Sequence, residues 1–537
     1  MGAAGSAAPL ARKRVLVTDS LQDVAVEALR AQGFAVDVIP TLPPDELCRR
    51  IAPYAGLIVR SASKITAEVI EGAAALEVIG RAGVGLDNVD VDAASRRGIV
   101  CMNTPGGNTI AAAEHTLAML LAMARKLPQA HAHLKGGKWE RGRFLGTEVY
   151  RKTLGVIGLG RIGTEVARRA QGFAMIVIAY DPYLTAEVAQ RLGVELVDLD
   201  TLYRRADFIT VHVPLTKDTR GLIGAAEFAK MRDGVRLVNC ARGGIIDEAA
   251  LAVAVETGKA AGAALDVFER EPPWGSPLLA EESVIVTPHL GASTEEAQAA
   301  VAVAIAQQVA DFLVRGIVRN AVNAPSVDPE LMKELAPYLT LCGKLGSFLG
   351  QLSEGRMAEA RLHYAGEVAS LGVEPLTVTF LKSLLAVILE DTLTDVNAPY
   401  LARQRGLRVV ESRTPVSEDF ASLVTAELRT DGGAWQVAGA LFHRKDPRIV
   451  QVDGYPMEAH PEGWMLVFSN DDVPGVIGRI GTLFGTRGIN IAGMQLGRQR
   501  PGGRAVSILN LDSPVPDEVL AELRALPHIR SATLVRL

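Results

Sequence analysis

Residues 153–170 read TLGVIGLGRIGTEVARRA, a β-branched apolar run that passes through Gly158, Gly160 and Gly163 into a helical pattern. In a strand–turn–helix unit such glycines permit a tight turn, close approach of the backbone to a pyrophosphate, and close packing of helix on strand. Asp181 ends the next expected strand, where a carboxylate accepts ribose hydroxyls and repels a 2′-phosphate. The stretch therefore predicts a doubly wound domain that binds NAD in preference to NADP.

Further strand-like runs on both sides of this stretch extend the pattern. Downstream they lie at residues 176–179, 208–213, 236–239, 263–267 and 284–287, and upstream a separate α/β alternation occupies residues 14–102. Regular alternation of strands with helical periods indicates parallel sheets. We therefore expect an α/β fold in which a Rossmann-type nucleotide-binding domain accompanies a flavodoxin-like substrate domain.

The C-terminal third differs in pattern. From residue 321 to about 461 we expect an α+β intervening domain, with alternation suggesting strands at residues 376–379 and 409–411. Residues 462–537 follow the order βαββαβ, which is ferredoxin-like.

Composition excludes several classes of partner. The chain has 56 basic and 61 acidic residues, a formal charge of -5, which gives no general attraction to nucleic acid or to an anionic membrane. Its four cysteines show no metal-ligand spacing, so we expect no metal and a reducing, cytoplasmic location. The apolar stretches at residues 110–124 and 299–314 contain polar interruptions and are expected to be buried helices rather than membrane spans. Residues 1–14 are expected to be a flexible leader.

Three side chains at successive strand ends suggest the chemistry. Oxidising a secondary alcohol by hydride transfer needs a base for the hydroxyl proton and a cation for the substrate carboxylate. Arg242, in NCARGG, can supply the cation, although a surface ion pair would also explain it. His289, in TPHLGAS, can be the base, and Glu271, in LDVFEREP, can stabilise its imidazolium better than Glu269. His212, by contrast, is expected to be a packed, hydrogen-bonded core histidine.

These segments, together with the glycine loop and Asp181, resemble those of the D-isomer-specific 2-hydroxyacid dehydrogenases, most closely the phosphoglycerate dehydrogenase branch. The resemblance extends over essentially the whole chain and implies that Arg242, Glu271 and His289 are catalytic. It also implies NAD contacts from Val84, Gly158, Gly160, Arg161, Ile162, Gly163, Asp181, Val213, Cys240, Ala241, Arg242, Asp266, His289, Gly291 and Ala292.

The same resemblance implies how the substrate is held and how the chain is divided. It assigns substrate contacts to Arg60, Ser61, Arg81, Asn108 and Arg141, the last reaching into a neighbouring subunit of a homodimer or homotetramer. It also implies that a segment after the nucleotide domain returns to the first domain. The expected domains are residues 1–103 with 293–320 (substrate), 104–292 (NAD), 321–461 (intervening) and 462–537 (ACT).

A small-molecule sensor is expected at the C-terminus. The segments NDDVPGVIG (470–478) and GINI (488–491) resemble the effector loop and next strand of an ACT domain. In the dehydrogenase family paired ACT domains bind serine, and Asn470, Asp472 and Asn490 match the ligand positions. Many ACT domains bind another amino acid or nothing, so the expectation of serine follows from the attached enzyme and not from these residues.

The expected activity is oxidation of 3-phospho-D-glycerate to 3-phosphooxypyruvate with NAD, the first step of L-serine biosynthesis, under feedback by serine. One alternative is a dehydrogenase for an unphosphorylated acid such as hydroxypyruvate, glyoxylate or 2-oxoglutarate. Another is a non-catalytic, NAD-sensing protein resembling the co-repressors built on this fold.

Overall fold

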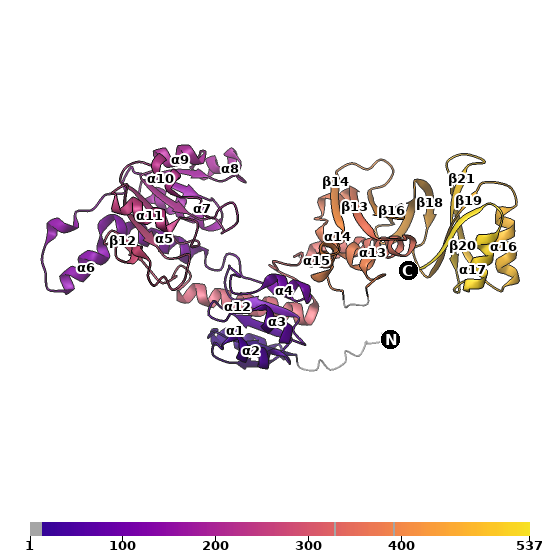
Figure 1. The fold of residues 1–537 in the computed structure, drawn as a ribbon, viewed down its shortest axis with the longest axis horizontal. Coiled ribbons are helices and arrows are strands. Elements are labelled where there is room, and N and C mark those ends of the chain that lie inside the picture. The colour runs from indigo at the N-terminus through magenta and orange to yellow at the C-terminus, as the bar shows by residue number, and fades with distance from the viewer. Residues whose placement is uncertain (1–12, 327–328, 390–392) are drawn as a thin grey trace.

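The computed structural model describes residues 13–326, 329–389 and 393–537. The expected leader thus lies almost entirely outside the described residues. Four sheets, each with its own helices, follow one another along the described chain. Figure 1 shows them as two N-terminal lobes, an intervening domain and a C-terminal domain at the far end.

The first lobe is built on a parallel sheet in the order β2-β1-β3-β4-β5, the flavodoxin-like order. The strands are β1 (Arg14–Val17), β2 (Ala35–Val38), β3 (Gly56–Val59), β4 (Val78–Arg81) and β5 (Val100–Met102). One face packs on α2 (Pro44–Ile51), α3 (Ala67–Gly72) and α4 (Val91–Arg96). The other packs on α1 (Asp23–Ala31) and on α12 (Glu295–Arg315), which returns from much later in the chain.

The nucleotide lobe holds a parallel sheet in the order β12-β11-β10-β9-β6-β7-β8. The strands are β6 (Thr153–Ile157), β7 (Ile176–Tyr180), β8 (Glu195–Leu196), β9 (Phe208–Val211), β10 (Val235–Asn239), β11 (Ala260–Leu265) and β12 (Val284–Val286). On one face lie α5 (Thr109–Arg125) and α7 (Arg161–Gly172). On the other lie α9 (Leu199–Arg205), α10 (Ala225–Lys230) and α11 (Glu248–Glu256). Burial of both faces explains why the strands are continuous apolar runs, and the expected fold class is confirmed.

Three short elements of this lobe were not expected from the sequence. The edge strand β8 has only two residues and no apolar run of its own, and α8 (Ala186–Arg191) precedes it. The long apolar helix ends at Arg125, and α6 (Leu127–Lys135) then projects from the lobe. The exposed side chains of Leu127 and Leu134 on α6 leave apolar surface uncovered.

The intervening domain has a six-stranded sheet in the order β14-β13-β15-β16-β17-β18. Its strands are β13 (Met357–Gly366), β14 (Arg408–Thr414), β15 (Ser422–Thr430), β16 (Gly433–Phe442), β17 (Asp446–Val452) and β18 (Tyr455–Ala459), and its helices are α13 (Pro329–Leu352), α14 (Glu374–Leu385) and α15 (Asn397–Gln404). The strand expected at residues 409–411 is confirmed within β14. The strand expected at residues 376–379 is wrong, because these residues lie in α14, whose apolar side chains pack against α13.

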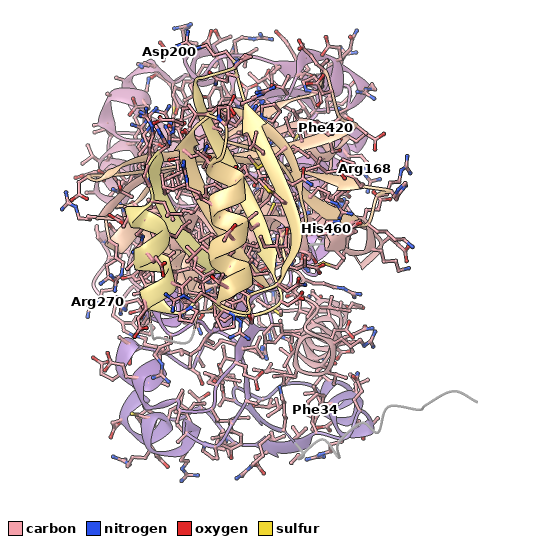
Figure 2. All side chains as sticks on the ribbon, turned by 90° about the vertical axis from the view of Figure 1, so that its right-hand side faces the viewer. Phe34, Arg168, Asp200, Arg270, Phe420 and His460 are labelled. Carbon is pink, nitrogen blue, oxygen red and sulfur yellow. The ribbon has the colours of Figure 1, made fainter. Side chains whose placement is uncertain are left out.

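The C-terminal domain has the expected βαββαβ order. It comprises β19 (Trp464–Asp471), α16 (Val476–Thr486), β20 (Ile491–Arg498), β21 (Arg504–Leu511), α17 (Asp517–Ala525) and β22 (Ile529–Arg536). The antiparallel sheet has the order β20-β21-β19-β22. Figure 2 shows α16 and α17 side by side on its outer face. The other face, with Met465, Val467 and Val506, joins the core of the intervening domain.

Helix α12 is the one described helix that is long and apolar enough to cross a membrane. Its side chains at Val301, Ile305 and Val309 are buried against the first sheet. Burial in the core of the first lobe therefore explains the apolar character of this helix.

Candidate active site

The glycine loop joins β6 to α7 and is tied to the end of the neighbouring strand. The backbone N–H of Leu159 donates to Asp181 Oδ2 (2.9 Å), and that of Tyr183 donates to Asp181 Oδ1 (2.9 Å). A Cβ on Gly163 would collide with the carbonyl oxygen of Gly158, so only glycine permits this packing of helix on turn.

The surface beside this loop fits a dinucleotide. A groove of about 870 Å³ is lined by Pro105, Gly106, Gly160 and Arg161, with Leu184 and Val188 from the far side. The N-terminus of α7 faces this region with Gly160 exposed, an arrangement that favours a pyrophosphate. Asp181 keeps free lone pairs on both oxygens for ribose hydroxyls, since each accepts one backbone hydrogen bond.

His289 and Glu271 form a hydrogen-bonded pair at the carboxyl edge of this sheet. His289 Nδ1 lies 3.0 Å from Glu271 Oε2 and 3.2 Å from Oε1, and both side chains are about half exposed. Partial burial is the largest single influence and would raise the pKa of Glu271, but the hydrogen bond to His289, the charge of His289 and the backbone N–H of Phe268 together lower that pKa. The ionised carboxylate therefore accepts the Nδ1 proton, which leaves Nε2 as the free imidazole atom.

Arg242 follows β10, the strand next to β11, and its side chain extends across to the first lobe. Its segment contacts the one that bears Glu271, because Gly243 packs directly on the backbone of Phe268. Its Nε lies 3.3 Å from Asp87 Oδ2, and a Cβ on Gly85 would collide with its guanidinium. The side chain thus spans the space between the two lobes. The ion pair with Asp87, which the sequence left open as an alternative role for Arg242, therefore joins one lobe to the other.

Arg60 and Arg81 of the first lobe gather around Arg242. Burial lowers the pKa of Arg81, and the charges of Arg242 and Arg60 lower it further. Within the described residues, Arg81 Nε and Asn108 Oδ1 are buried without a hydrogen-bond partner. Three clustered guanidinium groups and the unused Arg81 Nε–H donor make a site suited to an anion with more than one charge, whereas the unused Asn108 Oδ1 is an acceptor and does not contribute to it.

The loop that carries Arg60 and Ser61 is held by two residues that the sequence reasoning missed. Asp19 is buried and accepts hydrogen bonds from the backbone N–H groups of Arg60 (3.0 Å) and Ser63 (2.9 Å). Asn88 Nδ2 donates to the carbonyl oxygens of the same two residues, at 2.8 and 2.7 Å. Asp19 follows β1 directly, so attention to the carboxyl end of that strand could have found it.

The remaining expected cofactor residues differ in accessibility. Gly158 and Gly291 are buried in turns and Gly163 is buried in the first turn of α7. Val84, Arg161 and Ala292 are exposed, and Ile162, Val213, Cys240 and Ala241 are intermediate. Asp266 is fully buried under the turn that bears His289, so its carboxylate does not reach the cleft surface. His212, as expected, is hydrogen-bonded, with Nε2 3.0 Å from Thr210 Oγ1, and burial lowers the pKa of His212 to about 4.

Arg141 lies outside its own cleft. It begins the 3-10 helix η1 (Arg141–Phe144), is exposed, and places its guanidinium 5.3 Å from the ring centre of Trp139.

The expected effector residues do not converge within one chain. Asn470 is buried at the end of β19, and its Oδ1 has no partner among the described residues. Asp472 pairs with Arg498 at the end of β20 (2.9 Å), whereas Asn490 precedes the start of β20 and donates to Asp512 (2.6 Å). Because β20 has eight residues, the two positions are about 25 Å apart along the strand.

Comparison with known proteins identifies the family. Residues 117–291 match the family described as D-isomer specific 2-hydroxyacid dehydrogenase, NAD binding domain; residues 334–453 match the D-3-phosphoglycerate dehydrogenase intervening domain, and residues 464–528 match the ACT domain. The chain is 46% identical to the D-3-phosphoglycerate dehydrogenase of Methanocaldococcus jannaschii, over 98% of this chain and 100% of that one. The corresponding enzyme of Synechocystis is 45% identical, over 98% and 95%.

Solved structures agree for the two dehydrogenase lobes. A Thermus thermophilus protein is 37% identical with a TM-score of 0.54, over 57% of this chain and 99% of that one. The D-lactate dehydrogenase of Aquifex aeolicus, solved with NAD and lactic acid, is 30% identical with a TM-score of 0.51, over 58% and 100%. The chain therefore belongs to the D-3-phosphoglycerate dehydrogenase family, within the D-isomer-specific 2-hydroxyacid dehydrogenases.

Proposed function

We propose that this chain oxidises 3-phospho-D-glycerate to 3-phosphooxypyruvate with NAD, the first step of L-serine biosynthesis, and that Arg242, Glu271 and His289 perform the chemistry. The observation that carries the assignment of residues is the His289–Glu271 hydrogen bond at the nucleotide edge, together with an arginine at the end of the adjacent strand β10 that spans both lobes. A base, its carboxylate partner and a cation are the groups that this reaction requires.

The protein side of the reaction follows from these contacts. Arg242 binds the substrate carboxylate through its planar fork, displacing Asp87, and holds the reacting carbon in place. His289 Nε2 takes the hydroxyl proton as the C–H bond breaks, and Glu271 stabilises the imidazolium that forms. The Gly158 to Gly163 loop and Asp181 would hold NAD, which would supply the hydride acceptor.

The phosphate group has its own expected partners. Arg60 and Arg81 supply charge on the first-lobe side of Arg242, and Ser61 and Asn108 can donate further hydrogen bonds. The loop fixed by Asp19 and Asn88 presents Arg60 and Ser61 in a set position. We therefore assign phosphate recognition to the first lobe.

Comparing 3-phospho-D-glycerate with D-glycerate tests this assignment. The wild-type enzyme should have a much higher kcat/KM for the phosphorylated acid than for D-glycerate. Arg60→Gln should lower the ratio of these two kcat/KM values by about 10- to 100-fold, because a charge-assisted hydrogen bond to the phosphate is lost. Arg50→Gln, an exposed surface change in the same lobe, is the matched control. An unchanged preference in Arg60→Gln would remove Arg60 from the phosphate site.

The C-terminal ACT domain is proposed to bind serine between two copies of the chain. Antiparallel pairing of two sheets along their β20 edges would bring Asn490 of one copy to Asp472 of the other, which a single chain keeps far apart. Such pairing implies a homodimer or homotetramer.

A serine titration tests the sensor. Serine should inhibit the wild-type enzyme, and Asn490→Ala should raise the serine concentration for half-inhibition about 5- to 10-fold because a hydrogen bond to the ligand is lost. Glu518→Gln, an exposed change on α17, should behave as the wild type. If serine has no effect on the wild type, the sensor proposal fails; if Asn490→Ala is as sensitive as the wild type, the ligand binds elsewhere.

Assembly, location and domain limits complete the proposal. The exposed Arg141 segment can reach a neighbouring subunit, with α6 and its apolar side chains at the contact. Unpaired thiols at all four cysteines are compatible with the cytoplasm. The four sheets support domains at residues 1–103 with 293–320, 104–292, 321–461 and 462–537.

A further inference from the structure

The turn that bears His289 rests on a single buried carboxylate. Asp266, fully buried at the end of β11, accepts the backbone N–H of Leu290 at Oδ1 (2.7 Å) and that of Gly291 at Oδ2 (2.8 Å). The hydroxyl of Thr287 also donates to Oδ1 (2.6 Å), and the Asp266 carbonyl accepts the His289 N–H (2.9 Å). Residues 287–291 are thus anchored at four points to one residue.

This anchoring matters because His289 has an unfavourable backbone conformation. Its φ of 57° lies in the left-handed region, which residues other than glycine seldom adopt. Such a conformation persists only where the surroundings enforce it. The hydrogen bonds to Asp266 are the contacts that enforce it here, so they set the direction of the imidazole.

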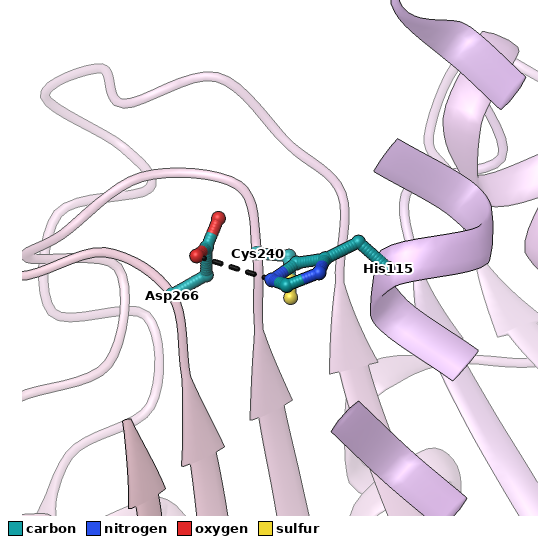
Figure 3. Close-up of side chains that lie close together, drawn as sticks. All are labelled: His115, Cys240 and Asp266. Carbon is teal, nitrogen blue, oxygen red and sulfur yellow. Dashed lines mark ion pairs between the residues drawn. The ribbon is translucent and has the colours of Figure 1, made fainter. Parts of the chain in front are cut away.

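A second histidine completes the arrangement from another element. His115, on α5, places Nε2 3.1 Å from Asp266 Oδ1 and 3.2 Å from Thr287 Oγ1. Figure 3 shows the imidazole reaching from the helix toward the carboxylate, with Cys240 beside it. A buried carboxylate needs such donors, because an ionised group without partners is costly to bury.

The same three side chains could hold a metal ion, since ligand atoms of His115, Cys240 and Asp266 all lie within 4.8 Å of one another. Two observations favour a hydrogen-bonded network instead. The carboxylate already accepts from Thr287, Leu290 and Gly291. The Nε2 atom of His115 likewise already lies within hydrogen-bond distance of Asp266 Oδ1 (3.1 Å) and Thr287 Oγ1 (3.2 Å).

We infer that His115 is a positioning residue for the reaction: by donating to Asp266, it holds the turn that presents His289 to the substrate. The inference rests on the proposed role of His289 as base. It links α5, which begins immediately after the chain crosses between the lobes, to the geometry of the reacting imidazole.

Three variants of the full-length enzyme test this. His115→Leu removes the donor and should lower kcat about 10- to 100-fold, with the KM for 3-phospho-D-glycerate and the Kd for NAD changed less than about twofold. His115→Gln can place an amide N–H near the Nε2 position and should restore kcat to within about threefold of wild type. Glu114→Gln, an exposed change one residue away, is the control and should leave kcat unchanged.

Other outcomes separate the possible explanations. Equal kcat in His115→Leu and wild type would overturn the inference, and so would a glutamine variant as slow as the leucine variant. If each wild-type chain holds one tightly bound zinc ion and His115→Gln loses it, these side chains form a metal site and the positioning inference is wrong. If the leucine variant does not fold, imidazole is added to His115→Ala and to the wild type. An increase in kcat in His115→Ala alone would support the inference, and no increase would overturn it.

The test also distinguishes this inference from the proposed function. If His289→Gln is inactive while His115→Leu is fully active, only the positioning role of His115 fails. If His289→Gln remains as active as wild type, the base assignment fails, and the inference about His115 fails with it.

Discussion

Replacing His289 with glutamine lowers kcat by about 10²- to 10⁴-fold, the usual contribution of a general base, while the Kd for NAD stays within about twofold. Glutamine keeps a side chain of similar reach that can still hydrogen-bond to Glu271, but it cannot take a proton. Stopped-flow measurement of NADH formation from 3-phospho-D-glycerate, across pH, reports the loss directly.

Two control variants make this result specific. His363→Gln changes an exposed histidine of the intervening domain that hydrogen-bonds to Ser412, and it should leave kcat unchanged. Glu269→Gln changes the carboxylate that pairs with Arg220 instead of His289, and it should have little effect, whereas Glu271→Gln should lower kcat. A His289→Gln enzyme with wild-type kcat would refute the assignment of the base.

Replacing Arg242 with glutamine is expected to have the second-largest effect, a loss of about 10²- to 10³-fold in kcat/KM. The guanidinium is the group that bridges the two lobes, and its removal takes away both the carboxylate fork and the polarising charge. Lysine retains the charge without the planar fork, so Arg242→Lys should recover part of the loss and no more. Steady-state kinetics with 3-phospho-D-glycerate and with NAD varied separately measures the change.

The matched control for Arg242 is Arg220→Gln. Arg220 is a neighbouring exposed arginine paired with Glu269, so its replacement should change kcat/KM less than about twofold. A glutamine variant at position 242 with unchanged kcat and KM would show that the arginine only joins the lobes through Asp87 and has no role in the reaction.

The parts of the site that sequence reasoning reached are those at strand ends. Gly158 to Gly163, Arg242 and His289 each follow an apolar run, and the carboxyl ends of parallel strands share one edge of the sheet. This shared edge predicts from the sequence alone that the three segments lie together. It also supported Glu271, whose spacing from β11 leaves it on the same edge.

The parts that were missed depend on contacts between distant residues or on weak local signals. Asp19 meets Ser63, and His115 meets Asp266, across separations of 44 and 151 residues, and neither pair leaves a local pattern. Residues 376–379 suggest a strand by alternation, yet packing of α14 on α13 determines a helix. Asn490 matches a ligand position, but within a single chain it lies at the opposite end of β20 from Asp472.

The return of α12 to the first lobe constrains how the chain is made. Strands β1 to β5 leave the ribosome about two hundred residues before α12 does, and until then one face of their sheet is covered by α1 alone. The nucleotide lobe, whose strands and helices are contiguous in sequence, meets no such delay. During translation the second lobe can therefore mature before the first, and a nascent chain released before residue 315 carries a sheet with one apolar face partly uncovered.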